Sequence, residues 1–105
     1  MENPTIRLKK ELNSIVSDLG YISEATLDIP KNKEFGDFST NIAMKIAKQI
    51  GKNPLEIAKD VVENLEKKSI DGVTRYEIVK PGFINFYIDN SYLKAVVLQI
   101  LNQKE

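Results

Sequence analysis

The sequence contains no cysteine and no histidine. Without cysteine the chain has no disulfide, thiolate metal ligand or cysteine nucleophile, which fits a reducing compartment. Without histidine it has no Ser/His/Asp triad, no imidazole zinc ligand and no histidine general base. Its acidic residues also fall at no spacing typical of a metal site or an acid/base pair. We therefore expect no catalytic, metal or cofactor site in this chain.

Long apolar runs and an excess of one charge are missing as well. Fifteen Lys and Arg residues balance fifteen Asp and Glu residues, so no overall positive field attracts nucleic acid or an anionic membrane. No apolar stretch approaches the roughly 20 residues that span a bilayer. The first residues lack the basic and apolar regions of a secretory signal. We expect a cytoplasmic protein without membrane contact, in which any contact with nucleic acid is local.

The hydrophobic pattern predicts four helices in a single domain, residues 1–105. Apolar residues recur at helical spacing over 4–19, 42–50, 55–65 and 93–101. Ser39 or Thr40 fits the N-cap of the second helix, and Gly51 fits its left-handed C-cap. Asn53 and Pro54 fit the N-cap and the first turn of the third helix. Ser91 precedes the last helix.

Strands are predicted at 25–29 and within 73–88. Pro30 bounds the first, and residues 31–38 follow as a polar loop. In the second region, alternating β-branched and aromatic residues are divided by Lys80-Pro81-Gly82, which indicates either a hairpin or one kinked strand. The element order α, β, α, α, β, β, α indicates an α+β fold, a small antiparallel sheet packed by about four helices.

Side chains alternate between two faces along the strand predicted to begin at Phe83. One face is apolar and is expected in the core, namely that of Ile84, Phe86 and Ile88. The other carries an aromatic, an amide and an aromatic: Phe83, Asn85 and Tyr87. Such a row can stack an unpaired base and hydrogen-bond its edge. Aromatics on strands more often pack under a neighbouring element, so alternation alone leaves both interpretations open.

Three motifs follow one another along the chain: Gly-Asp-Phe-Ser-Thr-Asn at 36–41, Asn-Pro at 53–54, and Pro-Gly-Phe-Ile-Asn-Phe at 81–86. Together they resemble the N-terminal additional domain of arginyl-tRNA synthetases, over essentially the whole chain. The resemblance implies a parent enzyme that uses ATP to ligate arginine to its tRNA. The class I signatures His-Ile-Gly-His and Lys-Met-Ser-Lys-Ser are missing, so the catalytic and anticodon-binding domains are absent from this chain.

The resemblance also implies partners and roles for single residues. The expected partners are the D loop at the elbow of arginine tRNA and the enzyme's own catalytic domain. Phe83 would stack on a D-loop base, and Asn85 would read the edge of that base. Lys80 lies where some members place a polar contact and is expected to meet phosphate. Tyr87 joins this set by alternation alone.

Several alternatives stay open. The chain is instead a protein-interaction domain if the Phe83 and Tyr87 face, or the apolar stripe of the last helix, docks on a catalytic body or another partner. Gly36-Asp37-Phe38 either contacts RNA or serves folding, with Gly36 in an unusual backbone conformation, Asp37 or Ser39 as a helix cap and Phe35 or Phe38 packed on the core. Basic residues border an RNA surface only if they share a side with Phe83: Arg7, Lys10, Lys45 and Lys48.

Overall fold

The structure is a computed structural model that describes residues 4–32, 34 and 36–89. Within these residues three helices and three strands follow in the order α1 (Pro4–Asp18), β1 (Phe38–Thr40), α2 (Ile42–Ile50), α3 (Pro54–Lys68), β2 (Val73–Val79) and β3 (Phe83–Ile88). The strands form one antiparallel sheet in the order β1-β3-β2. The predicted α+β fold is confirmed, and the helix predicted after Ser91 lies outside the described residues.

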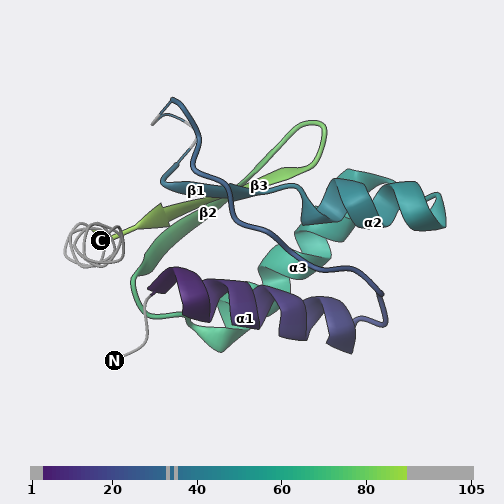
Figure 1. The fold of residues 1–105 in the computed structure, drawn as a ribbon, viewed down its shortest axis with the longest axis horizontal. Coiled ribbons are helices and arrows are strands. Elements are labelled where there is room, and N and C mark those ends of the chain that lie inside the picture. The colour runs from purple at the N-terminus through teal and green to yellow at the C-terminus, as the bar shows by residue number, and fades with distance from the viewer. Residues whose placement is uncertain (1–3, 33, 35, 90–105) are drawn as a thin grey trace, which may run out of the picture.

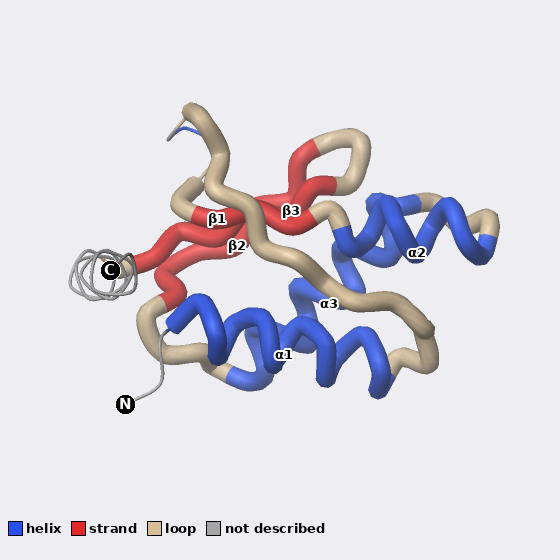
Figure 2. The backbone as a smooth tube through the Cα atoms, in the orientation of Figure 1, coloured by secondary structure: helices blue, strands red, loops and turns tan. Residues whose placement is uncertain are grey.

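The helices and the sheet enclose one core (Figure 1). α1 packs on α3, and α3 contacts both β2 and β3. Away from α1, the end of the α1–β1 connection and the β2–β3 turn both rise from the sheet (Figure 1). The tube in Figure 2 shows that this connection runs back along the molecule from the end of α1 to the sheet. One side of the sheet therefore faces helices and the other faces loops.

The helix ends follow local sequence signals. Gly51 has a φ of 71° and its N–H donates to the Ala47 carbonyl, as a left-handed C-cap does. The Asn53 side chain accepts a 2.9 Å hydrogen bond from the Leu55 N–H, and Pro54 occupies the first turn of α3. These predictions are confirmed.

The strand predicted at 25–29 is wrong. Asp28 and Ser39 exchange two backbone hydrogen bonds of 2.8 Å, but this is a single bridge and not a strand. Pro30 has no N–H with which to continue the pairing. The first strand is β1, a segment that the sequence assigned to the end of a loop and to a helix cap. The connection is thus attached to the sheet edge at one point.

The helix caps predicted at Asp37, Ser39 and Thr40 are also wrong, because Ser39 lies in β1 and the N-cap of α2 is Asn41. Thr40 does act at the helix start, since its hydroxyl accepts a 3.3 Å hydrogen bond from the Ile42 N–H. The Asp37 carboxylate instead accepts a 2.8 Å hydrogen bond from the Ile88 N–H. Asp37 therefore stabilises the end of β3 rather than a helix.

Gly36 holds the loop against β3. Its φ is +89°, and a Cβ added there would lie 2.8 Å from the Phe86 carbonyl oxygen. The Asp37 N–H donates to that same oxygen at 2.8 Å, and the Phe38 side chain is buried. The predicted folding role of Gly36 and Phe38 is confirmed.

The core face of the sheet has the predicted residues. Ile84 and Phe86 are fully buried and Ile88 is 6% exposed. Tyr76 on β2 packs edge-on against Phe86, with ring centroids 5.7 Å apart. β2 and β3 form a hairpin with the Gly82 N–H bonded to the Val79 carbonyl, so the kinked single strand is excluded.

Candidate nucleic-acid interface

A row of four residues crosses the sheet on its outer face. Asp28 pairs with Ser39 of β1, Ser39 pairs with Asn85 of β3, and Asn85 pairs with Glu77 of β2. Paired residues in an antiparallel sheet direct their side chains to the same face. Asn85 is therefore central, with Asp28 of the connection at one end of the row and Glu77 of β2 at the other.

A cavity of about 470 Å³ opens on this face. Its lining comes from the connection, from β1 and from the hairpin: Asp28, Pro30, Lys31, Ser39, Val79, Lys80, Phe83 and Asn85. The volume falls in the range of small-ligand sites. The structure thus brings together three of the four predicted contact residues, Lys80, Phe83 and Asn85.

The hairpin that carries Lys80 and Phe83 is seated on the helices. Gly82 is buried, and a Cβ there would lie 2.8 Å from the Pro54 Cβ and 3.0 Å from the Met44 Cγ. The turn therefore meets the junction of α2 and α3 at a distance that only glycine allows. This contact fixes the hairpin wall of the cavity, from which the Phe83 ring remains 40% exposed.

Asn85 was predicted to read the edge of a base, but the residue is more enclosed than this role implied. It is only 2% exposed, because the loop at 36–37 lies over β3 beside it. Its side chain lines the cavity, yet no group in the described part of the chain is its hydrogen-bond partner. The fully buried side-chain atom without a partner in the described chain is Asn41 Oδ1, whereas the Asn85 amide opens into the cavity. A donor and an acceptor are thus left for whatever enters the cavity.

Tyr87 does not line the cavity. Its hydroxyl donates to the Glu34 carbonyl at 2.9 Å and lies 3.3 Å from the Glu77 carboxylate. The Arg75 guanidinium covers its ring, 4.0 Å from the centroid. β3 is the central strand of the sheet, and the Tyr87 hydroxyl is bonded to the loop that lies over it. Tyr87 fastens the loop instead.

A sequence profile of the family described as arginyl tRNA synthetase N terminal domain matches residues 6–88. The chain belongs to this family. The matched range contains every residue that lines the cavity.

Relatives in the arginyl-tRNA synthetase family agree with this assignment. Arginine–tRNA ligase of Thermotoga maritima is 44% identical over 100 residues, covering 93% of this chain and 18% of that protein. The Shouchella clausii ligase is 40% identical over 110 residues, covering 100% and 20%. The arginyl-tRNA synthetase structure from Plasmodium falciparum has a TM-score of 0.73 at 20% identity and covers 92% of this chain and 18% of its own, which shows a shared fold. The chain spans about a fifth of these relatives.

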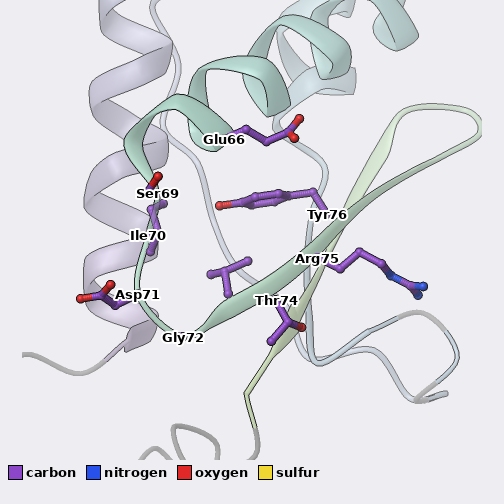
Figure 3. A pocket seen from close by; sticks show the side chains of 9 residues that line it. Glu66, Ser69, Ile70, Asp71, Gly72, Thr74, Arg75 and Tyr76 are labelled. Carbon is purple, nitrogen blue, oxygen red and sulfur yellow. The ribbon is translucent and has the colours of Figure 1, made fainter.

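A second cavity, of about 630 Å³, lies between the end of α3 and β2 (Figure 3). Tyr76 points into it beside Glu66, whereas Arg75 points to the other side of the strand (Figure 3). Burial, and secondarily the Glu66 carboxylate, raises the pKa of Tyr76 to about 12. Acidic and basic side chains both line this cavity, Glu66 and Asp71 together with Arg75. None of the predicted contact residues of the synthetase-family site lies there.

The four basic residues considered as a possible RNA border do not line the cavity with Phe83. Arg7 lies 3.9 Å from Asp71, and Lys45 donates to the Glu24 carbonyl at 2.9 Å. Lys31 of the connection does line it, together with Asp28, Pro30 and Ser39. The sequence patterns assigned Asp28, Pro30, Lys31 and Ser39 no binding role, because the bridge between Asp28 and Ser39 that brings the connection to the cavity is not visible in the sequence.

Two features are missing from the described residues, 4–32, 34 and 36–89. No three acidic side chains gather there as a metal ion would require. No helix there is long and apolar enough to cross a membrane.

Proposed function

We propose that this chain is a tRNA-binding domain whose cavity holds one base from the D loop of arginine tRNA. It would belong to an enzyme that ligates arginine to its tRNA using ATP. The observation that carries the proposal is the amide of Asn85, which lines the same cavity as the exposed Phe83 ring and has no side-chain hydrogen bond to another described residue. These are the two groups that a base needs, one for its face and one for its edge.

The cavity chemistry favours a nucleotide over other small ligands. Phe83 and Val79 supply apolar surface, and Asn85 supplies both a hydrogen-bond donor and an acceptor. Lys80 stands at the exposed turn, where it can meet phosphate. Tyr87 would hold the loop over β3 and would not stack on the base. Stacking and edge contacts are worth roughly 1 to 3 kcal/mol per base, so we expect weak binding by the chain alone.

Family membership supports tRNA as the nucleic acid. The relatives are arginine–tRNA ligases, and the chain matches a small share of each. A catalytic body would then bind ATP and arginine. This single domain would dock on that body and bind the tRNA elbow. The balanced charge also fits recognition by one local site rather than by a broad basic surface.

The experiment is an NMR titration of the ¹⁵N-labelled chain with arginine tRNA and with a transcript lacking the D-loop base. We expect shifts for residues around the cavity and weaker binding of the variant tRNA. Phe83→Ala should weaken binding about tenfold. Ile50→Ala is the matched control, because Ile50 is 44% exposed, as Phe83 is 40%, but lies outside the cavity. Equal affinity for both tRNAs and for both variants would refute the proposal.

A protein partner is the second candidate, because the connection exposes apolar side chains, Ile22 at 93% and Ile29 at 70%. Salt dependence separates the two candidates. Binding to RNA weakens steeply as salt rises because counterions are released from phosphates, whereas an apolar protein interface responds little.

A further inference from the structure

We infer that the connection at 28–31 forms the second wall of the nucleotide site and that Lys31 contacts a phosphate there. This inference rests on the proposed function, because it concerns the same cavity. It adds Lys31 and Pro30, which the motifs of the chain do not single out.

The sheet register places the connection across the sheet from Asn85 and the hairpin turn along β3 from it, since Phe83 precedes Asn85 by two residues and pairs with Val79. Asp28 is bridged to the outer side of β1, whereas Lys80 follows β2 on the far side of the sheet. Ser39 and Asn85 form the floor between them. A ligand seated on Asn85 is therefore flanked from both directions, by the hairpin and by the connection.

The two walls have matching chemistry. The hairpin contributes an apolar side chain and a cation to the lining, Phe83 and Lys80. The connection contributes Pro30 and Lys31. Apolar groups from both walls suit the two faces of a planar base, and a lysine from each wall suits the charged backbone on either side of it.

The charges indicate where the anion lies. Lys31 and Lys80 are exposed, and neither forms an ion pair within the described part of the chain. Asp28 lines the cavity and would repel a phosphate placed deep inside it. The phosphate therefore belongs at the rim beside the lysines, and the uncharged base belongs inside.

The position of Lys31 is set by the bridge. The two 2.8 Å hydrogen bonds between Asp28 and Ser39 attach the connection to β1 three residues before Lys31. Pro30 restricts the intervening backbone because its ring fixes φ. Lys31 is thus held near the cavity by the backbone, although no hydrogen bond or ion pair within the described part of the chain holds its side chain.

The test compares Lys31→Gln with Lys59→Gln, since Lys59 is an exposed lysine of α3 that lies outside the cavity. Affinity for arginine tRNA is measured between about 50 mM and about 200 mM salt. Loss of one phosphate contact lowers the salt slope by about 0.7 to 0.9, so the ratio of wild-type to Lys31→Gln affinity should fall about threefold over this range. Lys31→Arg should restore the slope, and Lys59→Gln should leave it unchanged.

The base-lacking transcript distinguishes the two proposals. Lys31→Gln should keep the full preference for intact tRNA, because it removes a charge and not a base contact. A Lys31→Gln protein with the affinity and slope of Lys59→Gln would overturn the role of Lys31 while the base preference still supports the proposed function. Loss of the base preference in the wild-type chain would overturn the proposed function itself.

Discussion

The two faces of β3 share one backbone but have opposite chemistry. On the core face, Ile88 is 6% exposed and packs among apolar residues. On the outer face, Asn85 is 2% exposed, yet its amide has no partner in the described chain. Similar burial therefore has different consequences, since the enclosed apolar side chain stabilises the fold, whereas the amide that lines the cavity has its hydrogen-bonding groups left for a ligand. Local departures from good packing of this kind are expected where a protein binds something.

The sharpest test of the comparison is Phe86→Ala. Phe86 is fully buried and contacts Tyr76 edge-on, so its loss should lower the free energy of unfolding by about 3 to 5 kcal/mol. Urea denaturation followed by circular dichroism measures this change. Phe83→Ala serves as the outer-face counterpart and should cost less than about 1 kcal/mol, because Phe83 is 40% exposed. Similar losses for the two variants would show that the faces do not differ as described.

Gly36→Ala probes how the outer face is closed. Gly36 has a φ of +89°, and the new Cβ would lie 2.8 Å from the Phe86 carbonyl oxygen. We expect a loss of about 1 to 3 kcal/mol in unfolding free energy, because the backbone is strained and the loop must move away from β3. Gly20→Ala is the control, since Gly20 also has a positive φ but nothing within 4 Å of its added Cβ. The excess loss at Gly36 measures the contact alone.

Asn85→Leu should have the smallest effect on stability. Leucine has a similar shape and carries no polar atom to leave unpaired, so the unfolding free energy should change by less than about 1 kcal/mol or rise. Binding of arginine tRNA should nevertheless fall about tenfold, because the edge contact is lost. A large loss of stability would mean that the amide is a structural group, and the comparison between the faces would fail.

Much of the fold could be predicted because its signals are local. Helical spacing over 42–50 and the pair Asn53 and Pro54 placed α2 and α3 without reference to the rest of the chain. Alternation separated Phe86 from Phe83 correctly for the same reason, since a strand has a fixed period. Such patterns need only neighbours in sequence.

The cavity depends on contacts that no local pattern records. β1 has three residues, too few for alternation to be recognised, and a strand was expected at 25–29 instead. The burial of Asn85 follows from the loop around Gly36, which approaches β3 from far away in sequence. Lys31 reaches the same cavity through the bridge at Asp28. The sequence thus indicated the hairpin residues that line the cavity, but not the residues of the connection that line it.

The contact of Gly82 with Pro54 and Met44 constrains length as well as residue type. Lengthening the turn between β2 and β3 would separate Gly82 from the junction of α2 and α3. It would also change the distance of Phe83 from the floor of the cavity. Insertions are usually tolerated at hairpin tips, because such tips project into solvent. This tip is packed against helices, and we expect it to accept neither added residues nor circular permutation. The number of residues in the turn thus determines the width of the cavity.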